Sequence, residues 1–239
     1  MRTFWLCLLS CCACVVFAQN PTSRVAVKWA PTGLALGSVS VQGEYNFAGK
    51  NSLTAKIGVP ANTAATINYS NEKARFNMKA TSFLAGYRRY LGKQAMRGLY
   101  VEPFFHYVHH IAEGRGDGTL ENMPVTFNFT NDYDAYGLGV QLGSQFRLGK
   151  HVIVDLFFLG PQLASARNNF MATEQTTVVP WSRIQEEDAR RQVTDFIDEF
   201  PFVRNKTTVA VDRSNKTVRA DFKGLLPGVR AGVSVGIAF

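Results

Sequence analysis

The sequence predicts an all-β protein, an eight-stranded antiparallel β-barrel that crosses a membrane, and three observations lead to this prediction. Short segments alternate apolar and polar side chains with the two-residue period of a strand. The apolar positions hold aliphatic and aromatic residues, whereas the opposite positions hold Gly, Ser, Gln and isolated charges. The connections alternate between tight turns and long polar segments. A soluble sandwich has no need for small and charged residues facing inward on strand after strand.

The first 18 residues predict a signal peptide, because Arg2 precedes a short apolar run that closes with Val16-Phe17-Ala18. We expect cleavage before Gln19, which leaves residues 19–239 as a single barrel domain. An uncleaved membrane anchor and a lipoprotein signal ending at Cys11 are the alternatives. All four cysteines lie in this segment, so the mature chain has no disulfide and no cysteine metal site.

Composition excludes two other classes of protein. The chain has 239 residues, and outside the N-terminal segment no part of it has the ~18 consecutive apolar residues of a membrane helix. The formal net charge is +8, but Lys and Arg are scattered along the chain and do not cluster. Scattered charge of this kind does not predict a nucleic-acid partner.

The first four expected strands lie between residues 24 and 91. Residues 24–30 alternate Val, Val and Trp with Arg, Ala and Lys, and a proline follows. Residues 38–47 and 52–59 alternate apolar side chains with Ser, Gln, Glu, Thr and Lys, and a glycine-containing turn joins them. Residues 77–91 form the fourth expected strand, which ends in a second glycine-rich turn.

The other four expected strands complete an even number. Residues 99–110 alternate, although a proline interrupts them. Residues 136–148 set Tyr, Leu, Val and Phe against Gly, Gln and Arg, and 152–158 follow after a Gly-Lys turn. The last strand, residues 228–239, has an aliphatic face that ends on Phe239, opposite a face of Gly, Ser and Arg.

The lengths of the connections predict which ends of the strands lie together. Tight turns are expected at residues 48–51, 92–98 and 149–150, and long polar connections at 60–76, 113–134 and 170–223. Bacterial outer-membrane barrels have short periplasmic turns and longer extracellular loops. A periplasmic N-terminus therefore places the tight turns and the C-terminus in the periplasm.

The last connection, the long loop insertion 170–223, is expected to have structure of its own. Ser182 and Gln185 have the spacing of a helix capping box, and Pro201 ends the apolar positions that follow at helical spacing. This helix is expected to cover the barrel rim or to contact a partner or lipid. Residues 207–222 predict a hairpin that protrudes, and the barrel would have ten strands if the hairpin entered the wall.

Charged residues on the inward face predict a network of ion pairs in the lumen. An eight-stranded barrel has an interior just wide enough for side chains, and buried charges persist there only when paired. We therefore expect a plugged lumen; a narrow polar conduit is the alternative. The members of the predicted network are Lys28, Glu44, Lys56, Arg88, Glu102, Arg147, Asp155 and Arg230.

Candidate catalytic and metal-binding residues are few. His106 and His110 share a strand face, but they are ~13 Å apart along the strand, too far for one metal ion without a bend. His109 and Glu113 lie nearby, but no nucleophile stands at a persuasive position beside them. The sequence therefore predicts no enzyme, no metal and no cofactor.

Several segments resemble a family of small outer-membrane β-barrels of uncharacterised function that is common in Bacteroidota, and more broadly the OmpA/OmpW-like eight-stranded barrels. The segments are residues 43–47, 86–91 with 98–104, 139–146 with 154–156, and 232–239. The resemblance implies an integral outer-membrane protein of a Gram-negative bacterium, exported through the general secretory route. It also implies that the barrel assembly machinery reads the C-terminal strand ending at Phe239. It carries over no catalytic residue.

The expected function is accordingly structural or partner-binding. The expected partners are outer-membrane lipid and lipopolysaccharide, the barrel assembly machinery during biogenesis, and other envelope proteins. A narrow passive transport conduit and an outer-membrane lipid-modifying enzyme are the alternatives.

Overall fold

The computed structural model describes residues 24–69 and 72–239. The predicted signal peptide (residues 1–18) and its cleavage site before Gln19 lie outside the described residues. The described chain is all-β, as predicted, with one antiparallel sheet and two α-helices.

Eight strands form a closed ring in the order β1-β2-β3-β5-β6-β7-β8-β10, because β10 pairs with β1 as well as with β8. Every neighbouring pair is antiparallel. The ring strands are β1 (Val25–Ala30), β2 (Ser38–Ala48), β3 (Asn51–Pro60), β5 (Glu72–Tyr90), β6 (Gly98–Leu120), β7 (Met123–Leu148), β8 (Val152–Glu174) and β10 (Thr217–Ala238).

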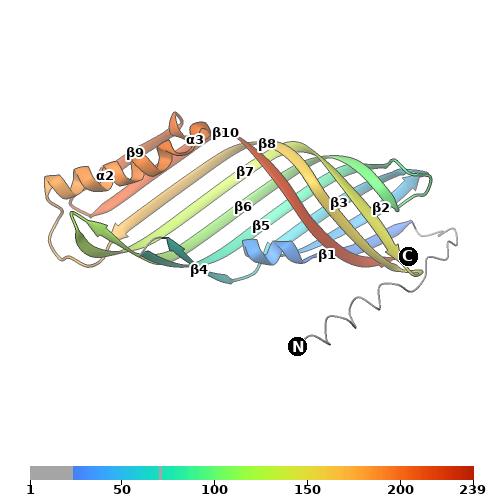
Figure 1. Cartoon of the computed structure of the whole chain (residues 1–239), viewed down its shortest axis with the longest axis horizontal. Helices are drawn as coiled ribbons and strands as arrows, with labels where there is room; N and C mark the ends of the chain where they lie inside the picture. Colours follow the sequence, from blue (N-terminus) through green and yellow to red (C-terminus); the bar gives the residue numbers. More distant parts are fainter. Residues whose placement is uncertain (1–23, 70–71) are drawn as a thin grey trace.

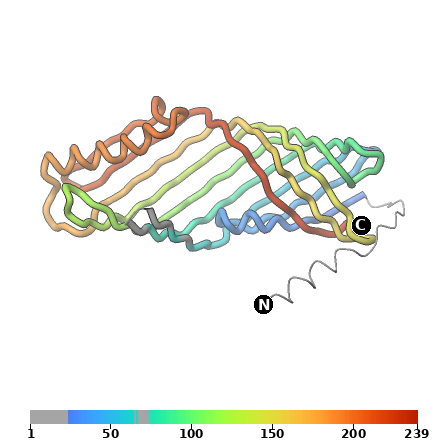
Figure 2. The backbone as a smooth tube through the Cα atoms, viewed as in Figure 1, coloured from blue at the N-terminus to red at the C-terminus, as the bar shows by residue number. Residues whose placement is uncertain are grey.

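The strands run obliquely to the long axis of an elongated molecule (Figure 1). The tight turns at residues 48–51, 92–98 and 149–150 and the C-terminus lie at one end, as the tube in Figure 2 also shows. Glycines with positive φ make two of these turns possible, Gly49 at 50° and Gly149 at 66°. We refer to this end as the turn end.

The wall of the ring has unequal height. β1, β2 and β3 have 6, 11 and 10 residues, whereas β6, β7 and β8 have 23, 26 and 23. Two further strands pair above the short side and outside the ring: β4 (Thr63–Tyr69) on β5, and β9 (Thr207–Asp212) on β10. The part of the sheet that rises beyond the short strands is called the extension below, and it occupies the end opposite the turns (Figure 1).

Two of the predicted loops are wrong, because they are strands of the extension. Residues 60–76 contain β4 and the start of β5, and residues 113–134 contain the end of β6 and the start of β7. The hairpin of β6 and β7 turns at Glu121 and Asn122, whose φ angles of 49° and 63° match a two-residue turn with both positions left-handed. The sequence signal was weak because Gly, Asn, Asp and Thr occupy these strands, and such residues usually mark loops.

The predicted helix in the last connection is confirmed as α2 (Arg183–Asp198), and its Ser182–Gln185 capping box forms. A second short helix, α3 (Pro201–Arg204), follows it. The helix does not cover the barrel rim; it packs against β9 and the inner face of the extension, where Ala189 joins Trp181 and Val218. The predicted loop 170–223 is therefore partly sheet, since β8 continues to Glu174 and β10 begins at Thr217.

The predicted hairpin of residues 207–222 exists, but its second arm is the upper part of β10 itself. β9 therefore pairs with a wall strand at the level above β1 and does not enter the closed ring. A 3-10 helix, η2 (Pro31–Leu36), links β1 to β2 at the top of the short wall, where only a turn is predicted.

The outer surface of the ring is apolar. Outward-facing residues such as Trp29, Ile57, Phe105, Leu138 and Val235 are 39–67% exposed. Among residues 24–69 and 72–239, no helix is long and apolar enough to span a membrane.

Candidate functional site

Five of the eight predicted lumen charges meet in the lower half of the ring, toward the turn end. They are Lys28, Glu44, Arg88, Glu102 and Asp155, and each is at most 2% exposed. We call this group the charge cluster. Its members come from β1, β2, β5, β6 and β8, so the cluster forms only when the ring closes.

Lys28 is bonded on three sides. Its Nζ donates to Glu44 Oε2, Asp155 Oδ2 and Gln145 Oε1, each at 2.7 Å. An ammonium group has three donors, so the buried Lys28 is fully satisfied.

Arg88 spans the rest of the cluster. Its Nε and Nη2 lie 2.7 Å from Glu102 Oε2, and its Nη1 lies 2.8 Å from Asp155 Oδ2 and 3.3 Å from Glu44 Oε2. The guanidinium carbon lies 3.7 Å from the ring centre of Tyr100. The planar fork of arginine can serve several carboxylates at once, which an ammonium does less well.

Neutral side chains complete the cluster. Tyr90 Oη donates to Glu44 and Tyr100 Oη to Asp155, each at 2.6 Å. Glu102 accepts from Gln141 Nε2 at 2.9 Å and from the hydroxyl of Thr54. These groups were not predicted, although the placement of Tyr90 on the inward face with Arg88 was a usable signal.

The energetic consequence is that loss of any one member of the cluster is costly. Removing one partner of a buried ion pair leaves an uncompensated charge and costs about 3–5 kcal/mol. Tyr90 and Tyr100 are at most 1% exposed and pack edge to face with ring centres 5.8 Å apart, so they form an aromatic layer beside the cluster. The cluster holds two cations and three carboxylates, an excess of one negative charge.

The remaining three predicted lumen charges lie elsewhere. Lys56 and Arg230 line a cavity above the cluster, and within the described chain neither has a carboxylate within 4.0 Å. Arg147 was predicted in the network, but it lies at the turn end, where its guanidinium bonds to the carbonyl oxygen of Lys150. Its position near the end of β7 places it beyond the closed part of the lumen.

A bulge in β8 shapes the cavity. The register of β8 with both β7 and β10 shifts by one residue next to Phe157. Phe158 and Leu159 therefore both face outward, at 56% and 48% exposure, and Phe157 faces inward at 7%. A strict two-residue period places Phe157 inward and Phe158 outward, as observed, but it also places Leu159 inward, because it cannot reveal the extra residue of the bulge.

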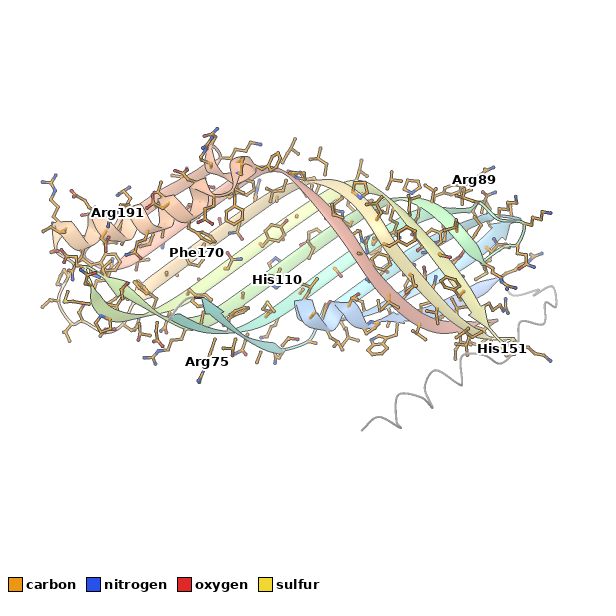
Figure 3. All side chains as sticks on the ribbon, in the orientation of Figure 1. Arg75, Arg89, His110, His151, Phe170 and Arg191 are labelled. Carbon is orange, nitrogen blue, oxygen red and sulfur yellow. The ribbon has the colours of Figure 1, made fainter. Side chains whose placement is uncertain are left out.

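The cavity has a volume of about 650 Å³. Its lining combines the two cations with His106, His110 and three serines from the short wall and β5. His106 Nδ1 and His110 Nε2 are buried atoms without a hydrogen-bond partner among the described residues. His110 lies near the middle of the long axis, and Arg89 and His151 lie toward the turn end (Figure 3).

The side chain of His109 points outward, whereas His106 and His110 line the cavity. On the outer surface its Nδ1 lies 3.0 Å from Asp134 Oδ1 and 3.5 Å from Asp132 Oδ1, and Tyr107 Oη also bonds Asp134. The ligand atoms of His109, Asp132 and Asp134 lie within 4.8 Å of one another, a spacing that suits a metal ion. The three side chains are half-buried or exposed and already bond one another.

Glu174 is a buried acid of the extension, with 0% side-chain exposure. Burial raises the pKa of this carboxyl. The hydroxyl and N–H of Thr177, the N–H of Thr176 and the charge of Lys216 outweigh burial and lower the pKa to about 2. Glu174 therefore fixes the chain where it leaves β8 toward α2.

Comparisons of the chain with protein-family models, with curated proteins and with solved structures find no match.

Proposed function

We propose that the chain is an integral outer-membrane β-barrel with a structural or partner-binding role and a lumen closed to solutes. The charge cluster is the observation that carries this proposal. Five buried charges and two tyrosines fill the ring at one level, and all three carboxylates of the cluster are bonded. A solute that crossed this level would have to separate buried ion pairs, which is a large free-energy barrier.

The membrane location rests on the outer surface of the ring. Its exposed aliphatic and aromatic side chains form a band that water solvates poorly but lipid solvates well. The apolar run at residues 1–18 supports export by the general secretory route. β10 ends at Ala238, and the Phe239 that follows it is 67% exposed, which suits recognition by the barrel assembly machinery.

Lipopolysaccharide is the lipid partner that we propose on the extracellular side. On the outer face, Arg167 and Lys223 are register partners, and they lie just beyond the exposed Leu163 and Leu225. Basic side chains at this level suit the phosphate groups of a lipid headgroup.

The helices that pack on the extension are the proposed surface for an envelope protein partner. Phe196 on α2, Phe200 between the helices and Phe202 on α3 are 62%, 47% and 62% exposed. Phe196 and Phe200 contact each other edge to face, with ring centres 5.3 Å apart. Aromatic side chains of this exposure are typical of the anchors in protein interfaces.

Single-channel recording in planar bilayers tests the closed lumen. Purified barrel, folded into lipid, is expected to give no stable open events at physiological salt. Regular open events would overturn the closed lumen in favour of a narrow passive conduit. A parallel gel of boiled and unboiled protein should show two mobilities, because a folded barrel migrates as a compact species.

A further inference from the structure

We propose that the cavity above the charge cluster is a binding site for a small monoanionic amphiphile, with Lys56 and Arg230 holding its carboxylate or phosphate group. This inference goes beyond the closed barrel and its extension, since it assigns a ligand to the upper lumen. The volume of about 650 Å³ lies in the range of small-molecule sites, ~300–1,000 Å³.

The two cations of the cavity differ from the two cations of the cluster. Lys28 and Arg88 each bond carboxylates at 2.7–2.8 Å. Within residues 24–69 and 72–239, Lys56 and Arg230 have no ion pair, and their charged groups lie over aromatic rings. Arg230 Cζ lies 4.8 Å from the ring centre of Phe104 and 5.1 Å from that of Phe157. Both cationic side chains are partly buried, and a partly buried cation is stabilised by a nearby anion, so a bound anion would complete the site.

The charge balance of the lumen points to a monoanion. Four cations, namely the pair in the cavity and the pair in the cluster, face three carboxylates. One positive charge remains, and it lies on the side of the cavity because the cluster below is negative by one. A ligand with a single negative charge neutralises it.

Neutral donors around the cations suit the oxygens of such a group. Ser38, Ser40 and Ser82 line the same cavity, and the unpartnered nitrogens of His106 and His110 are available to a ligand. A carboxylate offers about four lone-pair sites, which charged and neutral donors can share. The serine hydroxyls can therefore bond to anion oxygens alongside the two cations.

Most of the remaining lining is apolar, apart from Thr32, Gln162 and two tyrosines, which favours an amphiphile over a bare inorganic ion. Leu84, Val108 and Phe157 line the cavity together with alanines of η2, β5 and β10. Burying an alkyl chain against these groups contributes ~0.8 kcal/mol for each methylene.

The test is calorimetric titration of the full-length barrel in lipid nanodiscs, with empty nanodiscs as the blank. The probes are octanoate, octyl phosphate and the uncharged octanol, at about pH 5.5, where octyl phosphate is mainly a monoanion. We expect saturable binding of at least one anion, weaker binding of octanol by tenfold or more, and perturbation of the His106 and His110 ring signals in NMR spectra. The tighter of the two anions identifies the headgroup class.

The double variant Lys56→Gln/Arg230→Gln should weaken anion binding at least tenfold, whereas Lys93→Gln, an exposed cation in a tight turn at the turn end, should not. A gel of unboiled protein checks that each variant folds. Addition of the anion should also raise the unfolding midpoint of the wild type but not that of the double variant. Absence of saturable anion binding, equal binding of octanol, or an unchanged affinity in the folded double variant would each overturn the proposal. Inorganic phosphate that binds as tightly as octyl phosphate would overturn the proposal that the ligand is an amphiphile. A conducting barrel that still binds the anion would overturn only the closed lumen.

Discussion

Arg88 and Asp155 lie across the lumen from each other, 67 residues apart in the chain, and their Nη1 and Oδ2 atoms are 2.8 Å apart. In the ring, β5 and β8 are separated by two strands on one side, β6 and β7, and by four on the other, β3, β2, β1 and β10, so the ion pair braces the ring across its interior. Asp155 shares the same oxygen with Lys28, which ties β1 to both. Together, Lys28, Arg88 and Asp155 therefore link the start, the middle and the later part of the chain.

Replacement of Arg88 by Met should destabilise the barrel by about 3–5 kcal/mol, because Glu102 and Asp155 would keep buried charges without their main partner. Urea titration of the protein in lipid vesicles, followed by tryptophan fluorescence, measures the loss. Arg89→Met is the matched control, since the adjacent Arg89 is exposed and faces outward. An equal loss in both variants would contradict a structural role of the charge cluster.

Gly143→Ala should also destabilise the barrel. A Cβ at this position would lie 2.3 Å from Tyr100 Oη, so Tyr100 would have to leave its bond with Asp155. Displacement of packed side chains typically costs about 1–3 kcal/mol. The same urea titration applies, and Gly43→Ala is the control because its nearest neighbour atom would be 4.0 Å away. A Gly143→Ala barrel as stable as the control would show that Tyr100 has room to move.

Of two adjacent residues of α2, the smaller Ile197 should cost more stability than the larger Phe196 when each is replaced by Ala. Ile197→Ala should weaken the packing of the helix by about 2 kcal/mol, because Ile197 is only 9% exposed. Phe196→Ala should change stability by less than about 0.5 kcal/mol, since Phe196 is 62% exposed. Hydrogen exchange of the α2 amides measures both effects. If Phe196→Ala proved the more damaging change, Phe196 would be a packing residue and not a free surface for a partner.

Sequence periodicity was sufficient for the ring and for the inward face at most positions, because outward-facing and lumen-facing residues alternate everywhere except at the bulges. It could not show that Lys56 and Arg230 stand apart from Lys28 and Arg88, since all four occupy equivalent inward positions. Their separation depends on the height at which each strand crosses the lumen, which the pairing registers set. The extension was missed for a different reason: its strands are solvated and polar, so they lack the apolar alternation that marks the ring.

Glu174 should make the structure at the exit from β8 sensitive to acid. Its pKa in the folded protein is about 2, below the ordinary value of 4.5, so the carboxylate stabilises the folded form at pH above 4.5. This stabilisation is lost as the pH falls from 4.5 toward 2. At pH 7, Glu174→Gln should lower the protection of the Thr176 and Thr177 amides by about 1–2 kcal/mol, allowing for solvent that screens part of the charge.

Hydrogen exchange at pH 7 and again near pH 2.5 measures the difference between wild type and variant, which should shrink at the lower pH. Glu187→Gln is the control, because Glu187 pairs only with the exposed Arg183 and its side chain is 67% exposed. Its effect should stay below about 0.5 kcal/mol at both pH values. A Glu174→Gln difference that persists undiminished at pH 2.5 would mean that the hydrogen-bonding shape of the side chain, and not its charge, holds the exit from β8.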